Sequence, residues 1–316
     1  MFNMLVKVIP IILLMMIGYI IKVKNLIKNE SIRDINKIVI NISLPAILFN
    51  NFLTMKLEKE YLLIVLINIL LLIMLYYIGT LINKTEKFSH PLNPLIVTGF
   101  SFGLLGIPLF RTVFGAENLG NLLILGISNE IFIWFIFFPL IKLDSSKNSF
   151  SFNRIIEFFK SPITLAIIFG ILFNILGYES IFKMNNILKG IYETFVFLGD
   201  LATPLILIGI GYGLSFTKKY MKTSIKLVLF RLFLILFLGY IFKFLFINKI
   251  MTSTNLFNYA FFTFLILPPP FALPILISEI AGKNDLEELA NNTVMLSTVT
   301  SVLIYIFFVF LISNNL

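Results

Sequence analysis

The chain has 316 residues, of which 59% are hydrophobic and 13% are charged, and its formal net charge is +9. Soluble domains carry about 25% charged residues, so this composition excludes a water-facing globular protein. The mean hydropathy of +0.98 indicates an integral membrane protein. The chain has no Cys and a single histidine, His90, which excludes disulfides and thiolate metal sites and leaves little imidazole chemistry. The Lys and Arg residues lie in short loops, where membrane topology explains them, so a nucleic-acid partner is not expected.

Ten apolar segments follow one another along the chain, each about as long as a helix that crosses a hydrocarbon core of ~30 Å. They lie near residues 4–21, 34–53, 60–82, 92–114, 119–141, 161–178, 190–215, 223–247, 256–281 and 286–312. We interpret them as ten transmembrane helices, because barrel strands are half as long and alternate in polarity. The predicted fold class is therefore all-α integral membrane. No small-residue cleavage site follows the first segment, so we expect a retained helix in place of a signal peptide.

Lys and Arg residues are unequally divided between alternate connections. The loops after segments 1, 3, 5, 7 and 9 hold fifteen of them, and the opposite side holds seven. By the positive-inside rule, both termini of this multi-pass chain are expected outside the cell membrane. The longest inner loop, residues 143–160, contains the stretch FNRIIEFF, which has one apolar helical face. This pattern fits a short helix on the inner leaflet and equally an ordinary loop.

Three motifs recur in the same order in the second half of the chain. IPIILLMMIG (9–18) resembles SPITLAIIFG (161–170), NISLPAILF (41–49) resembles DLATPLILI (200–208), and GIPLFRTVFGAENL (106–119) resembles ALPILISEIAGKNDL (272–286), which aligns Pro45 with Pro204 and Pro108 with Pro274. We therefore predict two five-helix repeats, residues 1–142 and residues 161–316. An odd number of helices inverts the second repeat in the membrane, which is the plan of many secondary transporters.

Segments 4 and 9 contain helix-breaking residues near their middle. They read TGFSFGLLGIPLF and LPPPFALPILI. A Pro inside a helix costs ~3 kcal/mol or more, so we predict discontinuous helices with breaks near Gly106–Pro108 and Pro269–Pro274. Freed backbone groups must be buried or line a cavity. Two such breaks in inverted repeats would cross near the midplane, with helix N-termini directed at an anion. For either Pro alone a structural kink is the commoner explanation, and the symmetric pair favours a site.

Three ionisable residues are expected at membrane depth, where burial is costly and function is the usual reason for it. They are Glu130, Asp200 and Arg231. We interpret Glu130 or Asp200 as a proton-coupling group, because desolvation favours a protonated carboxyl. The structural alternative is an ion pair between Arg231 and one acid, with the other acid protonated. Arg111 is expected to extend to the outer surface, and the glycines of IGIGYG (208–213) are expected to form a close helix contact.

Several of these motifs together resemble the auxin efflux carrier family, which includes bacterial permeases and plant PIN-type carriers. The matching stretches are GYIIKVKNLI, SIRDINKIVINISLPAILF, GLLGIPLFRTVFGAENL, LGDLATPLILIGIGYGLS, LPPPFALPILISEIAG and NNTVMLSTVTS, between about residues 18 and 301. The resemblance implies ten helices with both termini outside and organic anion substrates such as dicarboxylates or indole acetate. It also implies a scaffold of segments 1, 2, 6 and 7 and a mobile transport domain of segments 3–5 and 8–10, with segments 4 and 9 crossed. Where members often carry Asn, this chain has Ser101.

These observations predict a secondary active transporter that moves a small organic anion, a carboxylate, by alternating access. The expected substrate contacts are Ser101, Gly103, Gly106, Pro108, Asn129, Pro269 and Pro274, and Pro45 and Pro204 are expected to break the scaffold helices. No cofactor is expected, and no metal-ligand set is identified. The expected partners are the substrate, membrane lipid and a proton or other coupling ion, and a homodimer is left open. A channel or ligand sensor on the same scaffold is the alternative; an enzyme is not expected, because no HExxH, GxGD or Ser/His arrangement is present.

Overall fold

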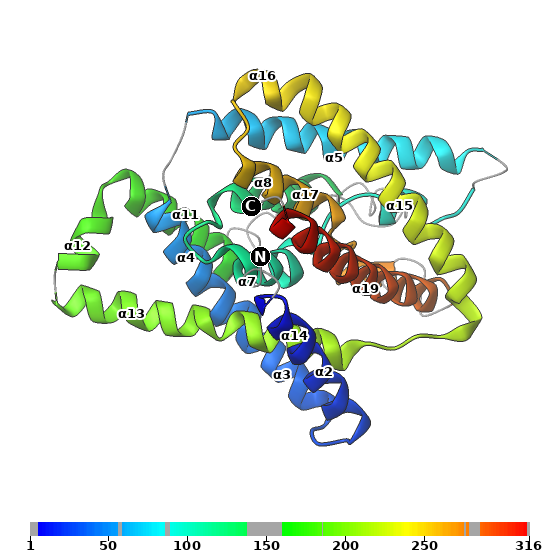
Figure 1. Cartoon of the computed structure of the whole chain (residues 1–316), viewed down its shortest axis with the longest axis horizontal. Helices are drawn as coiled ribbons and strands as arrows, with labels where there is room; N and C mark the ends of the chain where they lie inside the picture. Colours follow the sequence, from blue (N-terminus) through cyan, green and yellow to red (C-terminus); the bar gives the residue numbers. More distant parts are fainter. Residues whose placement is uncertain are drawn as a thin grey trace.

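The structure is a computed structural model that describes residues 6–55, 59–85, 89–137, 160–184, 186–274, 276–277 and 285–314. Within these ranges the secondary structure consists of helices and short connections (Figure 1). Apart from Lys160, the inner loop 143–160 and its expected surface helix lie outside the described residues.

Within the described residues, the first half of the chain contributes ten helical elements. They are α2 (Ile9–Val23), α3 (Asn29–Ile38), η1 (Val39–Ser43), α4 (Leu44–Thr54), α5 (Tyr61–Asn83), α6 (Asn93–Ile96), η2 (Phe102–Gly106), α7 (Ile107–Phe114), α8 (Gly120–Phe132) and η3 (Ile133–Phe137). The elements η1, η2 and η3 are π-helical turns. The second half contributes α11 (Pro162–Ile175), α12 (Tyr178–Met184), α13 (Asn186–Asp200), α14 (Ala202–Gly213), η4 (Lys218–Tyr220), α15 (Met221–Phe242), η5 (Lys243–Ile247), α16 (Asn248–Ile250), α17 (Asn255–Ile266) and α19 (Asp285–Asn314).

Within the described residues, six continuous helical stretches are long and apolar enough to cross a membrane, and four shorter apolar stretches accompany them. The long stretches are Glu30–Thr54, Tyr61–Asn83, Gly120–Phe137, Asn186–Gly213, Lys218–Ile250 and Asp285–Ser313, and the shorter ones are Ile9–Val23, Phe102–Phe114, Pro162–Ile175 and Asn255–Ile266. Each stretch falls on a different one of the ten segments expected from the sequence. The all-helical membrane character of the chain is therefore confirmed.

A helix that the sequence did not predict, α12, lies between segments 6 and 7. Gly177, with a φ of +73°, ends α11 in the left-handed region that favours glycine. The chain then turns into α12, where the ring of Phe182 packs against Phe49 at 6.2 Å and against Phe173 at 6.0 Å between ring centroids. Aromatic packing against α4 and α11 thus holds a helix in what the sequence suggested to be a connection.

The helices form two packed groups. In the first, α2 lies along α14, and α4 packs against α11 and α13. In the second, α8 packs against α5 and α17, and α15 packs against α17 and α19. The first group occupies the lower left of Figure 1, and α5, α15 and α19 occupy its upper right. We count α7 with the second group, because it contacts α19. It also contacts α14 and α2 of the first group, so the two groups meet there.

Close packing within the first group depends on two glycines. A Cβ added to Gly18 would lie 2.0 Å from the carbonyl oxygen of Ile208, and one added to Gly211 would lie 2.0 Å from the carbonyl oxygen of Met15. The backbones of α2 and α14 therefore approach so closely that no side chain fits between them, as small residues permit between membrane helices. The expected helix contact at IGIGYG is confirmed at Gly211, whereas a Cβ on Gly213 would meet nothing within 4 Å.

The core is largely apolar, but it also encloses many polar side chains, and numerous large apolar side chains are exposed on the outside of the protein. The buried polar side chains include Asn68, Ser101, Asn129, Ser224, Arg231, Asn292 and Ser301. The exposed apolar ones include Leu62, Ile187, Phe197, Phe233 and Phe244. This distribution is what a lipid-facing surface requires, because lipid cannot satisfy polar groups.

Candidate functional site

Segment 4 is interrupted at residues 97–101, between α6 and η2. Gly99 lies at the centre of this break with a φ of +77°, which side chains disfavour. The expectation of a break at Gly106–Pro108 is therefore wrong. The helix runs from Phe102 to Phe114 without interruption, because the π-helical turn η2 leads directly into Pro108 and such a local adjustment compensates for the missing N–H of a proline. The same device occurs in segment 2, where the π-helical turn η1 precedes Pro45 at the start of α4.

Segment 9 is interrupted at residues 267–272, directly after α17, as expected from its run of prolines. Leu267 has an extended ψ of 146°, which ends α17 one residue before Pro268. Helical geometry resumes at Leu273 and Pro274. The prolines Pro268, Pro269 and Pro270 therefore form the break, and Pro274 belongs to the turn that follows it.

The two breaks contact each other directly. The backbone N–H of Ser101 donates to the carbonyl of Pro268 at 2.9 Å, and the Ser101 hydroxyl donates to the carbonyl of Pro269 at 2.7 Å. Gly99 lies so close to Pro270 that an added Cβ would be 3.0 Å from the proline Cγ. The chain thus brings together Ser101 and Pro269, two residues predicted for the site, which are 168 positions apart.

The unwound backbone at each break is held by a residue from the last segment of the same half. Asn129 on α8 accepts from the N–H of Phe100 at 2.9 Å and donates to its carbonyl at 3.1 Å. Ser301 on α19 donates to the carbonyl of Ile266, the last residue of α17. Buried backbone groups that a broken helix leaves unpaired need such partners. Asn129 therefore supports the break, and its amide is engaged with the backbone.

Arg231 on α15 lies at the same crossing, 1% exposed. Its guanidinium donates to the carbonyls of Ile96, Gly99 and Leu267. Among the described residues, no carboxylate forms a salt bridge with Arg231, so the suggested ion pair with Asp200 or Glu130 is not what the structure contains. Unwound carbonyls of both breaks replace the acid, because they carry partial negative charge and lack helical partners.

A small, partly open cavity lies beside the crossing, between the two helix groups. Its walls come from α4 and α11 of the first group and from η2 and α8 of the second: Leu44, Leu48, Phe52, Phe102, Gly103, Leu123, Ile127, Glu130, Ile163 and Ile167. The walls are apolar except at Glu130. Of the predicted site residues, Gly103 and Glu130 line this cavity, whereas the N–H of Gly106 donates to the carbonyl of Ser101 at 3.2 Å and is used within η2.

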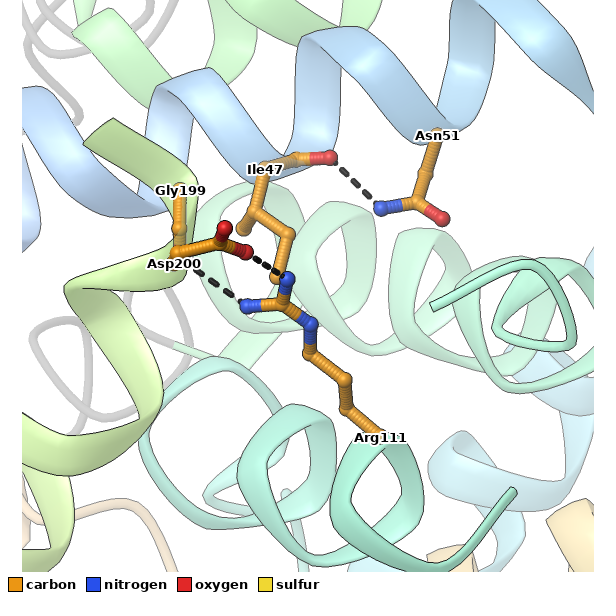
Figure 2. A network of polar contacts seen from close by, with 5 residues as sticks. All are labelled: Ile47, Asn51, Arg111, Gly199 and Asp200. Atoms are coloured by element: carbon orange, nitrogen blue, oxygen red, sulfur yellow. Dashed lines mark hydrogen bonds and ion pairs between the residues drawn. The ribbon is translucent and has the colours of Figure 1, made fainter. Parts of the chain in front are cut away.

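Asp200 lies away from the crossing. It ends α13, and its carboxylate forms a salt bridge with Arg111 of α7, which also donates to the carbonyl of Gly199 at 3.0 Å (Figure 2). The Asp200 side chain is 53% exposed, so it does not occupy a dry interior. The sequence analysis expected Arg111 to extend to the outer surface and did not predict its contacts with Asp200 and Gly199. Pro204 lies in the first turn of α14, just after Asp200.

Two functional contacts were missed by the sequence analysis. Ser301 is one of several hydroxyl residues in its segment, and nothing local distinguishes it. The pairing of Arg111 had a signal in the sequence. Arg111 is a base and Asp200 is an acid, and each lies in an apolar segment that contains one of the repeat prolines, Pro108 or Pro204. Pairing them would have left Glu130 as the one remaining acid of the three expected at membrane depth that could pair with Arg231.

Comparison with known proteins gives a family for nearly the whole chain. Residues 3–309 match the family described as membrane transport protein. A protein of Methanothermobacter thermautotrophicus named "Uncharacterized transporter" is 23% identical over 230 residues, which cover 69% of this chain and 70% of that protein.

Proposed function

Because this chain belongs to the membrane transport protein family, the family of the auxin efflux carriers that its motifs resemble, we propose that it is a secondary active transporter for a small organic anion. It is a multi-pass membrane transport protein and not an enzyme. The observation that carries the proposal is the contact of two interrupted helices beside a cavity. Interrupted helices that meet within the membrane are typical of substrate sites in secondary transporters.

The proposed substrate is a carboxylate bound beside the crossing. Helical geometry restarts after each break, at Phe102 and at Leu273, and helix N-termini carry partial positive charge. The adjoining cavity has apolar walls that suit the body of the substrate. Gly103 and Ser101 are the proposed contacts, with Ser101 exchanging its bond to Pro269 for one to the carboxylate.

The proposed architecture is ten transmembrane helices in two inverted repeats. The alignment that pairs Pro108 with Pro274 also pairs Phe100 with Ile266. Phe100 lies within the first break and Ile266 directly precedes the second, and the carbonyl of each accepts a hydrogen bond from the last segment of its own half. These hydrogen bonds were not used to align the two halves of the sequence, so their correspondence supports the repeat independently. The unequal distribution of Lys and Arg supports termini on the outer side.

In the proposed cycle, segments 1, 2, 6 and 7 are the scaffold and segments 3–5 and 8–10 the transport domain. The cavity has walls from both sets, so movement of one set against the other would open it to alternate sides. Glu130 is the proposed proton-coupling group, because it lines the cavity and belongs to α8 of the moving set. A homodimer and the identity of the carboxylate are left to measurement.

Counterflow in proteoliposomes tests the proposal. Vesicles loaded with an unlabelled carboxylate, first chosen by thermal stabilisation of the purified protein, should accumulate the labelled compound transiently against its gradient. Flux that rises linearly with concentration and shows no counterflow would identify a channel. Specific stabilisation without any flux would identify a ligand sensor.

A conservative variant tests the location of the site. A Cβ at Gly103 would be 3.8 Å from Leu44 Cδ1, an ordinary contact, so Gly103→Ala adds a methyl to the cavity wall without a clash. We expect a raised KM with an unchanged thermal transition. Gly190→Ala is the matched control, because a Cβ there meets nothing within 4 Å on the helix α13. Equal KM values for both variants would place the substrate elsewhere.

A further inference from the structure

Three backbone carbonyls converge on the guanidinium of Arg231. Ile96 is the last residue of α6, Gly99 lies in the first break, and Leu267 follows the end of α17. Arg231 donates to the Ile96 carbonyl, to the Gly99 carbonyl at 3.0 Å and to the Leu267 carbonyl at 2.8 Å. Carbonyls at the ends of both interrupted helices therefore accept hydrogen bonds from the same positively charged side chain.

The carbonyl oxygens at these helix ends are of the kind that binds cations. The last four carbonyls of a helix lack helical partners, and the C-terminus carries about half a negative charge. In transporters with interrupted helices, unwound carbonyls and half-helix C-termini coordinate the coupling Na⁺. Here the same type of oxygen cluster is filled by a side chain of the protein, which is covalently attached and cannot leave during the cycle.

The described contacts of Arg231 do not neutralise its positive charge. Its guanidinium carbon lies 4.9 Å from the centre of the Phe100 ring, a cation–π contact, and Phe100 packs on Phe264 with ring centroids 4.4 Å apart. Asp200 is engaged by Arg111 on another helix. The described hydrogen-bond partners of Arg231 are all neutral carbonyls, so none of them neutralises its charge.

We infer that Arg231 is a built-in cation that fills the place of a coupling metal ion at the crossing of the two breaks. Transport therefore requires neither Na⁺ nor K⁺, and the same charge favours an anionic substrate. Arg231 is a positioning residue that acts through the backbone of both breaks. The inference rests on the proposed transport activity and specifies its ion requirement.

The first test uses the unaltered protein. Carboxylate uptake into proteoliposomes is measured in media with Na⁺, K⁺ or choline as the main cation, at equal ionic strength and with the membrane potential clamped. We expect rates that agree within about twofold. A fall of about tenfold when Na⁺ or K⁺ is replaced by choline would overturn the inference while leaving the transporter proposal intact. If no medium supports flux, the transporter proposal fails.

The second test replaces the cation chemically. Arg231→Ala should lower uptake by roughly tenfold or more, because the three carbonyls of the two breaks would lose their charged donor. Guanidinium or methylguanidinium ion should restore uptake or, if the variant is unstable, raise its thermal transition. Arg231→Lys keeps the charge and should retain more activity than Arg231→Ala.

Lys243→Ala is the matched control for chemical rescue. Lys243 is also a buried cation on the helical run that follows α15, but it donates to the side chain of Asn248 at 2.8 Å, away from the breaks. Guanidinium should not affect this variant selectively. Equal responses of the Arg231→Ala and Lys243→Ala variants, or no response of either uptake or stability in Arg231→Ala, would overturn the inference.

Discussion

The guanidinium of Arg111 joins the carboxylate of Asp200 across the boundary between the two helix groups. Arg111 belongs to α7 and Asp200 to the end of α13, where Gly199 packs against Ile47 of α4 (Figure 2). Lys7 makes a second contact across this boundary, donating to the carbonyl of Val113 at 2.9 Å. If the groups move against each other during transport, these contacts at the end of α7 must break.

Cross-linking this boundary should arrest transport. The chain has no Cys, so the double variant Arg111→Cys, Asp200→Cys can be joined selectively by a bifunctional thiol reagent that spans two side chains. We expect flux to fall to background after cross-linking, because α7 can no longer move relative to α13. Each single-Cys variant treated with the same reagent is the control. Full flux in the cross-linked protein would show that this boundary stays fixed.

Neutralising the pair should have a small effect on stability. Asp200 is 53% exposed, and ion pairs exposed to water contribute about 0–1 kcal/mol, so we expect a small effect if the pair lies at the aqueous end of these helices. Arg111→Gln should therefore shift the thermal transition little, while changing the rate at which the groups separate. The measurement is a comparison of thermal transition and flux for Arg111→Gln, Asp200→Asn and the double variant. A large loss of stability in either single variant would contradict a weak contact.

Glu130→Gln should remove the pH dependence of flux and retain substrate binding, because an amide mimics the protonated carboxyl. The measurement is uptake between pH 5 and 8.

His90→Gln is the control for the only imidazole. Partial burial lowers the pKa of His90, so His90 is neutral at pH 7 and takes up its proton at lower pH than an ordinary histidine. We expect His90→Gln to retain the wild-type profile; a wild-type flux that is flat across this range would exclude Glu130 as the coupling group.

Gly211→Ala should destabilise the fold by about 1–3 kcal/mol, because overpacking forces closely packed elements apart. An added Cβ would lie 2.0 Å from the Met15 carbonyl, which is a backbone atom and cannot rotate away. Gly213→Ala, two residues further on, meets nothing within 4 Å and is the matched control. Thermal unfolding in detergent distinguishes the two. Equal transitions would mean that α2 and α14 are not closely packed.

Asn129→Leu should destabilise the first break. The variant leaves the N–H and carbonyl of Phe100 without their side-chain partner, and a buried unsatisfied group costs about 1–3 kcal/mol. Asn41→Leu is the control, because the Asn41 amide is exposed and donates only to the Lys37 carbonyl on the preceding turn. We expect a lower thermal transition and a lower flux for Asn129→Leu alone. A normal transition would indicate that water or another side chain satisfies Phe100.

The sequence by itself determined the properties that depend on short stretches of chain. Hydropathy over about 20 residues identifies a membrane helix, and each apolar helical stretch among the described residues overlaps a different predicted segment. The run Pro268–Pro270 ends α17 whatever surrounds it, because proline lacks an N–H and restricts the residue before it. The motifs indicated the family for the same reason, since each is local.

Only the tertiary structure decided how the breaks are arranged. Segment 4 contains Gly99, Gly103, Gly106 and Pro108, and any of them is able to weaken a helix. The break forms at Gly99 because Asn129 pairs with Phe100 and the prolines of segment 9 pack and bond there. The partners of Arg231 and Asp200 were likewise not predictable, since they lie between 36 and 135 residues away. A local pattern shows that a helix is weak or a charge is costly, but the groups that satisfy it are brought near only when the helices pack.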